Sequence, residues 1–363
     1  MYTGHCTEMK SEHRKKIIMV GPDLAGQGGV SRVVTIWQDS GFFADYGLDY
    51  VASCSDASKH KLLTLLKGLW SFVLLLAPVD LVYIHTSAFT SFYRKSLFLL
   101  LARLFGKKVI LHIHPSGFYD FYTGTSGFFH SYCAFVLGQV SIFVVLADEM
   151  KLNISTHFPR TPIHVLRNAI NLQEMSDNSG IKRKSNELLY LGWYIRAKGV
   201  YELVDAVELL TQRGIALHLN FYGTKEVAQL TEYVRSKQLT SEITVNGWIG
   251  NDGKLKALYE SSMLILPSHS EGIPNVILEA MATKTPIVAT FVGGMKEILR
   301  DGENALTVEV NNPVDLSDKI LMLLQDDALR NHLAENAYQE AAEKYDVPVI
   351  RNYFRDIIEG ACR

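Results

Sequence analysis

The sequence predicts an α/β protein with a parallel sheet in each half of the chain. Short apolar segments that suit strands alternate with longer helical patterns, which is typical of parallel sheets wrapped by helices. Glycine-rich or polar loops follow several of these strands, as they do where such sheets bind ligands. The chain has 363 residues, of which 48% are hydrophobic, so two domains of ordinary size can each bury a core.

The first half opens as a βαβ unit. A strand is expected at 16–20, followed by a glycine loop and a helix at 31–38. The later strands are predicted at 49–53, 80–85, 108–114, 141–146 and 163–166. The later helices are predicted at 62–77, 91–105, 126–137 and from residue 148, with an aromatic loop at 118–122. We expect residues 1–170 to form the first domain.

The second half repeats the alternation after a polar stretch at 167–183, which predicts the linker between the domains. Its strands are predicted at 187–191, 216–222, 243–246, 263–266, 287–289 and 305–309. Its helices are predicted at 199–212, 225–237, 252–260, from residue 274, up to residue 300, and at 313–326, 328–345 and 347–359. We expect residues 184–345 to form the second domain and 346–363 to form a C-terminal helix.

The glycine loop of the first half contains the pair Gly28 and Gly29, which carry no side chain to obstruct a ligand. Their spacing does not match the dinucleotide fingerprint GxGxxG. The pair therefore favours close approach of a ligand to the backbone, and the alternative is a flexible surface turn.

Composition excludes some classes of protein. The net charge of -2 gives no nucleic-acid footprint. The four cysteines, Cys6, Cys54, Cys133 and Cys362, lack metal-ligand spacing, so we expect free thiols in a reducing compartment. Residues 1–16 are polar and lack the apolar core of a secretory signal, which predicts a cytoplasmic protein.

Two features hint at a membrane surface. Residues 1–180 hold 16 Lys and Arg against 13 Asp and Glu, whereas the remainder holds 20 against 25, so the first half is basic and also aromatic. The apolar run 62–77 is interrupted by Lys67 and falls short of the roughly 20 residues that span a bilayer. The predicted helix 91–105 has basic ends and an apolar body, which suits docking on anionic lipid or, equally, packing on the sheet.

His112 and His114 stand two residues apart near the end of a predicted strand, so their side chains share a face. Loops beyond such strand ends carry ligand sites. A metal ion is not expected, because no third ligand has supporting spacing. We predict that one histidine is turned toward a substrate.

The stretch 267–282 predicts an anion site. A Ser, Gly and Pro loop leads from a strand into a helix with Pro274 near its first position, where a missing N–H costs nothing. The free N–H groups of Gly272, Ile273 and the first helical turn would lie beyond the carboxyl end of the strand, where phosphates bind.

Two carboxylates in this stretch, Glu271 and Glu279, complicate a simple anion site. A sugar nucleotide reconciles them, with its phosphates on the amides and its sugar and ribose hydroxyls on the carboxylates. The alternative is that Glu279 faces solvent and Glu271 is a helix-terminal charge favoured by the dipole.

Arg196 and Lys198 lie in the loop after the strand 187–191. Both could reach one polyanion, Arg196 through its fork and Lys198 as a point charge, and they would neutralise a diphosphate. As isolated residues they could equally be solvated.

Together these motifs resemble the C-terminal signature of the family 4 retaining glycosyltransferases, which have the GT-B fold. Glu271 and Glu279 match the EX7E motif of that family, and residues 192–199 are similar to its cation loop. Over the first half the resemblance is thinner. It rests there on Gly28, Gly29, Arg32 and the strand end at His114. Departures at Asn168-Ala169, Lys284 and Ala305, where glycines are common in the family, affect local loop shapes.

The resemblance implies two Rossmann-like domains that face each other across a cleft, with the final helix packing back toward the first domain. It implies that Arg196 and Lys198 bind the donor diphosphate and that Glu271 holds the donor sugar. Glu279 would bind the ribose, and His114, with His112 as the alternative, would lie beside the sugar. The remaining donor-binding residues would be Gly272, Ile273, Pro274, Asn275, Gly28 and Gly29.

The resemblance further implies transfer of a sugar, commonly from a uridine donor, to a glycan or lipid-linked acceptor in cell-surface polysaccharide synthesis. No metal or other cofactor is implied, because cations and helix amides stabilise the leaving diphosphate. Two alternatives stay open. One is a nucleotide-sugar epimerase on the same fold, and the other is a non-catalytic sugar-nucleotide binding module.

Overall fold

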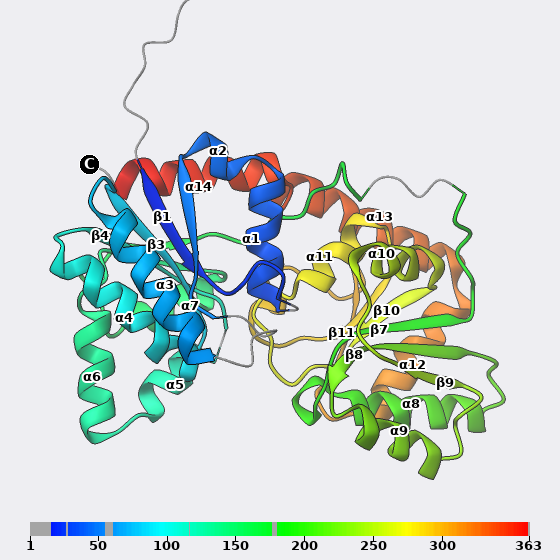
Figure 1. The fold of residues 1–363 in the computed structure, drawn as a ribbon. Helices are drawn as coiled ribbons and strands as arrows, with labels where there is room; N and C mark the ends of the chain where they lie inside the picture. The colour runs from blue at the N-terminus through cyan, green and yellow to red at the C-terminus, as the bar shows by residue number, and fades with distance from the viewer. Residues whose placement is uncertain (1–15, 27, 55–60, 116, 176–179, 362–363) are drawn as a thin grey trace, which may run out of the picture.

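The computed structural model describes residues 16–26, 28–54, 61–115, 117–175 and 180–361. Within them, two six-stranded parallel sheets lie side by side, with helices on their faces (Figure 1). The predicted α/β class with one parallel sheet in each half is confirmed. Cys6 and Cys362 and most of the polar N-terminus fall outside the described residues.

The first sheet has the order β2-β1-β3-β4-β5-β6, and each strand predicted in the first half overlaps one of these. Its strands are β1 Ile17–Gly21, β2 Leu48–Ala52, β3 Leu81–Thr86, β4 Lys108–Ile113, β5 Ile142–Val145 and β6 Ile163–Val165. Its helices are α1 Gly29–Asp39, α2 Phe42–Asp45, α3 Lys61–Leu76, α4 Thr90–Leu104, α5 Phe118–Gly124, α6 Gly127–Leu137 and α7 Asp148–Ser155. The central strands are apolar on both faces because a hydrophobic core lies on each side of the sheet.

The second sheet has the order β12-β11-β10-β7-β8-β9. Its strands are β7 Glu187–Tyr194, β8 His218–Lys225, β9 Ile243–Asn246, β10 Met263–Leu266, β11 Ile287–Thr290 and β12 Leu306–Val308. Its helices are η1 Arg196–Lys198, α8 Val200–Gln212, α9 Val227–Ser236, α10 Asn251–Glu260, α11 Asn275–Ala282, η2 Gly293–Glu297, α12 Pro313–Gln325 and α13 Asp327–Lys344. The chain leaves β7 in one direction to form β8 and later returns to its other side as β10, so a topological switch point lies between β7 and β10.

Two local predictions were wrong. The expected aromatic loop 118–122 is helix α5, because Phe118, Phe121 and Tyr122 follow a helical spacing and all pack into the core. The helix expected to end at residue 300 is the short 3₁₀ helix η2, which begins at two glycines of low helix propensity.

The chain crosses between the domains twice, near Ile170 and near Val347, and the two crossing segments lie side by side. The Ile170 N–H donates to the Tyr345 carbonyl at 2.8 Å, and the Val347 N–H donates to the Ile170 carbonyl at 3.0 Å. The buried Asn168 side chain donates to the Ile273 carbonyl at 2.9 Å. The start of the predicted linker is therefore held by hydrogen bonds to the second domain and to the returning chain.

The last helix, α14 Val347–Ala361, packs on the first sheet although it follows the second domain in sequence (Figure 1). Its apolar residues share a core cluster with those of β1 and α1. The ring of Phe354 is fully buried, and its centroid lies 4.9 Å from that of Trp37 and 5.6 Å from that of Tyr83. The C-terminal helix thereby completes the core of the first domain.

We expect Phe354→Ala to lower the free energy of unfolding by about 3–5 kcal/mol, because it removes a large side chain from a closed aromatic cluster. Tyr353→Ala, one residue away and 55% exposed, should change it by less than about 0.5 kcal/mol. Urea unfolding followed by tryptophan fluorescence measures both, since Trp37 reports on the cluster. Equal midpoints for the two variants would show that α14 does not support this core.

Candidate functional site

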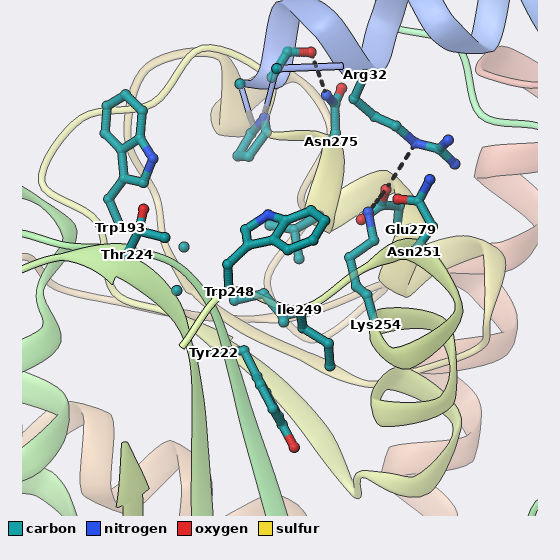
Figure 2. A pocket seen from close by; sticks show the side chains of 18 of the residues that line it. Arg32, Trp193, Tyr222, Thr224, Trp248, Ile249, Asn251, Lys254, Asn275 and Glu279 are labelled. Atoms are coloured by element: carbon teal, nitrogen blue, oxygen red, sulfur yellow. Dashed lines mark hydrogen bonds and ion pairs between the residues drawn. The ribbon is translucent and has the colours of Figure 1, made fainter. Parts of the chain in front are cut away.

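A cleft of about 540 Å³ opens beyond the carboxyl ends of the strands of the second sheet (Figure 2). Its walls come from the ends of β7 and β8, the chain after β9, helix α10, and the loop and helix that follow β10. Helix α1 of the first domain closes the opposite side with Gly28, Gly29 and Arg32. The volume lies within the range of small-molecule sites in proteins.

Lys198 and Glu271 meet across the switch point of the second sheet. Lys198 follows β7, Glu271 follows β10, and the Lys198 Nζ lies 2.6 Å from the Glu271 Oε1. The Ser268 hydroxyl donates to the same oxygen at 2.7 Å. The two residues that the sequence predicted to act on one donor are thus brought together as a half-buried ion pair that lines the cleft.

Close packing of backbone segments holds these two loops in place. Gly199, with φ +68°, ends the Lys198 turn, and a Cβ there would stand 2.0 Å from the Pro267 carbonyl oxygen. Gly293, with φ +49°, packs in the same way on the Glu271 carbonyl oxygen. Only glycine fits both positions.

Glu279 is 1% exposed and carries its charge between two cations (Figure 2). Lys254 of α10 donates to its Oε1, and the Arg32 Nε of α1 lies 3.6 Å from the same oxygen. The alternative of a solvent-facing Glu279 is therefore wrong. Sequence reasoning missed Lys254, because no motif marks it and its partner is 25 residues away.

Gly28 and Gly29 line the cleft at the start of α1. The Asn275 side chain, from the first turn of α11, donates to the Gly29 carbonyl at 3.0 Å (Figure 2). A Cβ at Gly28 would meet nothing within 4 Å, so the open space beside it belongs to the cleft. Pro274 also lines the cleft and caps α11.

Residues 172–340 match the family model described as glycosyl transferases group 1. This segment includes Lys198, Glu271 and Glu279. The match covers 169 of the 363 residues, so the similarity to this family belongs to the second half of the chain. The resemblance to the family 4 glycosyltransferases that the sequence motifs indicate is thereby confirmed.

Relatives and a solved structure extend this finding. An uncharacterized glycosyltransferase of Methanocaldococcus jannaschii is 35% identical over 181 residues, which cover 50% of this chain and 49% of that protein. The capsular polysaccharide biosynthesis glycosyltransferase CapM of Staphylococcus aureus is 24% identical over 181 residues, which cover 48% of each protein. The chain spans about half the length of the relatives that it matches. HepE of Anabaena, solved in complex with UDP and glucose, is 14% identical, covers 95% of this chain and 100% of that chain, and gives a TM-score of 0.74. That likeness confirms the GT-B fold.

Two exposed tryptophans, which the sequence analysis did not name, line the cleft. Trp193 is 46% exposed and Trp248 is 55% exposed. Figure 2 shows the ring of Trp248 projecting toward the middle of the cleft, with Tyr222 and Ile249 nearby. Exposed flat rings of this kind suit stacking with a nucleobase. The available signal was one tryptophan near the end of β7 and another just after β9.

Four predicted site residues lie outside the described lining of the cleft. Arg196 is exposed in η1, where three residues per turn place its side chain on a different side from that of Lys198. Gly272 and Ile273 follow Glu271 in the same loop, where Ile273 is 3% exposed. His114 is 8% exposed at the end of β4.

His114 belongs to a buried cluster with His85 and His112. His85 Nδ1 and His114 Nε2 are 2.8 Å apart, and His112 Nδ1 lies 3.0 Å from the Tyr83 hydroxyl. Burial lowers the pKa of all three imidazoles. The pKa of His114 falls to about 3, because the charge of Lys95 adds to the effect of burial. The cluster is therefore neutral at pH 7.

The three imidazoles stand close enough to share a metal ion. Sequence reasoning found no third ligand, because His85 reaches the pair from the neighbouring strand, in register with His112. The rings of His112 and His114 are stacked, with their centroids 4.2 Å apart. With His85 and His114 already joined, the arrangement is that of hydrogen-bonded neutral histidines.

Because of the histidine cluster, we expect the free energy of unfolding to fall as the pH is lowered. The folded pKa values lie below the unfolded value of about 6.5, so the unfolded chain takes up protons first. The stabilising contribution is complete above pH 6.5 and is lost as the pH falls from 6.5 toward 3. We expect each of the three histidines to contribute at most about 1.4 kcal/mol per pH unit to the slope of the free energy of unfolding against pH.

Urea unfolding at intervals between pH 7 and pH 4.5 measures that slope. His112→Gln should flatten it, whereas His332→Gln, at an exposed position on α13, should leave it unchanged. A His112→Gln slope equal to that of the unaltered protein would rule out the cluster as its source.

Proposed function

We propose that the chain is a retaining glycosyltransferase that moves a sugar from a UDP-sugar to a glycan or lipid-linked acceptor in cell-surface polysaccharide synthesis. The observation that carries the proposal is the meeting of Lys198, Glu271 and Glu279 in one cleft within the family segment. The names of two similar proteins support the donor and the product, since HepE was solved with UDP and glucose and CapM acts in capsular polysaccharide biosynthesis.

In this proposal the two carboxylates divide the hydroxyl groups of the donor. The contacts of Lys198 and Ser268 with Glu271 both use Oε1. Those of Lys254 and Arg32 with Glu279 also use Oε1. In the proposal each Oε2 is left to accept hydrogen bonds from the ligand. The Oε2 of Glu271 accepts from the sugar hydroxyls, and the Oε2 of Glu279 accepts from the ribose hydroxyls.

The diphosphate lies between the carboxylates in this proposal. Lys198 neutralises it, and the amides of Gly272, Ile273 and the start of α11 at Asn275 donate to it. Arg196 adds a second cation when its exposed side chain swings toward the diphosphate on donor binding. These groups stabilise the charge that develops as the diphosphate leaves, so the proposed mechanism needs no metal ion.

The remaining roles depend on closure of the cleft. His114 would lie beside the donor sugar, and Gly28 and Gly29 would let the phosphates and the acceptor approach the first domain. Closure excludes water that would otherwise hydrolyse the donor. The acceptor hydroxyl attacks from the face that the diphosphate leaves, and the phosphate oxygen takes its proton, which retains the configuration. The reaction is placed in the cytoplasm, where Cys54 and Cys133 stay free thiols.

We expect Lys198→Ala and Glu271→Gln each to lower kcat/KM for transfer by about 100-fold or more, because each removes a group aimed at the donor. Lys237→Ala is the matched control. Its Nζ lies 2.7 Å from Glu208 in a half-buried pair outside the cleft, so its activity should match that of the unaltered protein. Full activity in a folded Lys198→Ala protein would overturn the site.

Donor binding can be tested without an acceptor. A UDP-sugar at about 100 times its Kd should stabilise the fold by about 2.7 kcal/mol, which a thermal shift screen of nucleotide sugars detects. Trp248→Ala should weaken binding of the donor by about tenfold, because stacking on a base contributes about 1–3 kcal/mol. Phe291→Ala, at an exposed aromatic outside the cleft lining, should not change it.

The same assays separate the other two functions that the sequence left open. Conversion of a nucleotide sugar to its epimer without any acceptor would replace the proposal by an epimerase. Tight donor binding with no turnover across a panel of glycan and lipid-linked acceptors would replace it by a binding module.

A further inference from the structure

Helix α3 is apolar on both of its faces. Its inner face, with Phe72 and Leu76, is buried in the core of the first domain. Its outer face follows a helical spacing and is exposed to solvent, with Trp70 exposing 68% of its surface. The exposed apolar residues of α3 are Leu62, Leu63, Leu66, Trp70, Val73 and Leu74. A helix that is apolar all round is typical of one covered on both sides, and a water-facing stripe of this size marks an interaction surface.

Helices α4 and α6 widen this surface. All three helices bury their inner residues in one core cluster on the same side of the first sheet, and they lie together in Figure 1. We call the exposed apolar residues of α3, α4 and α6, with the adjoining Phe105, the outer apolar face. Beyond α3 it consists of Leu97, Leu104, Phe105, Phe128, Phe129 and Phe135. Leu104 is 78% exposed and Phe128 is 79% exposed.

The charges on these helices have one sign. Helices α3, α4 and α6 contain no Asp or Glu, and their exposed charged residues are Lys61, Lys67 and Arg103. Lys95 is buried and does not belong to this surface. The chain as a whole has more acidic than basic residues, 38 against 36, so this bias is local. An apolar stripe on helices whose exposed charges are all cations complements the surface of an anionic bilayer, where acyl chains lie under phosphates. A protein partner would have to supply an acidic and apolar surface of the same shape.

We propose that the outer apolar face docks on a bilayer of anionic phospholipid. Apolar side chains such as Trp70 enter the boundary between headgroups and acyl chains, while Lys61, Lys67 and Arg103 meet lipid phosphates. The attachment is peripheral, since none of the described helices is long and apolar enough to cross a membrane. Membrane docking does not depend on the proposed transfer reaction.

The orientation has a consequence for the cleft. The loop after β1 and the start of α1 line the cleft, so the carboxyl edge of the first sheet faces it. Helix α3 follows β2 and runs back over the sheet, so its first turns, with Leu62 and Leu66, lie near that edge. Docking would hold the cleft beside the bilayer, where a lipid-linked acceptor would be within reach.

Flotation of the full chain with vesicles tests the proposal. We expect binding to vesicles of phosphatidylglycerol and phosphatidylcholine at low salt, and at least tenfold weaker binding to pure phosphatidylcholine or at about 0.5 M salt. The double variant Leu66→Ser with Trp70→Ser, and separately Lys61→Glu with Lys67→Glu, should each bind about tenfold more weakly. The controls are Val314→Ser with Met322→Ser, exposed apolar residues of α12, and Lys151→Glu, an exposed lysine of α7, which should bind as the unaltered protein does.

Three measurements keep the test decisive. Thermal unfolding should be the same for the outer-face variants, because they alter only exposed side chains. Transfer to a soluble acceptor should also be unchanged, so a failure of docking is distinct from a failure of the proposed function. Vesicles should shift the tryptophan emission to shorter wavelength, and Trp70→Phe should bind yet lose most of this shift.

Two results would overturn the proposal. One is equal flotation of the outer-face variants and the unaltered protein. The other is a dimer in solution that the Leu66→Ser with Trp70→Ser variant abolishes while no form binds vesicles, since the face would then be covered by a second copy of the chain.

Discussion

The buried carboxylate of Glu279 is the constraint around which the cleft is arranged. A charge that is 1% exposed costs about 3–5 kcal/mol when its partner is removed, so the fold must bring cations to it. Lys254 arrives from α10 and Arg32 from α1. Satisfying one side chain thus fixes the distance of two helices from α11, and one of them belongs to the first domain.

Close packing of loops shapes the floor of the cleft. The switch point between β7 and β10 leaves a gap beyond the strands. The loops after β7, β10 and β11 approach one another so closely there that Gly199 and Gly293 have no room for a side chain. This packing places the Lys198 Nζ 2.6 Å from the Glu271 Oε1. A site of opposite charges, held before any ligand binds, loses little freedom when a donor enters.

The sequence predicted the features that depend on local residue patterns. It missed the contacts that form only when distant segments of the chain pair. The strands of the described residues were predicted because apolar runs between polar loops are a local pattern. Glu271 and Glu279 were predicted because their spacing is a motif. The joining of His85 to His112 and His114 depends on the register of two strands, and the pairing of Lys254 with Glu279 depends on how two helices cross. Helix α5 has its aromatic spacing in the sequence, but it is only 7 residues long, and periodicity over so short a stretch does not separate a helix from a loop.

The two cations at Glu279 are not equivalent when the domains move. Lys254 belongs to the same domain as Glu279, whereas Arg32 belongs to the domain on the other side of the cleft. If the cleft opens to admit a donor, Arg32 leaves and Lys254 remains, so the buried carboxylate keeps a partner and opening avoids most of the penalty of an unpaired charge. Closure then restores the Arg32 contact and the hydrogen bond from Asn275 to Gly29. With this division, Glu279 has one partner within its own domain, Lys254, and only its contact with Arg32 depends on the position of the first domain.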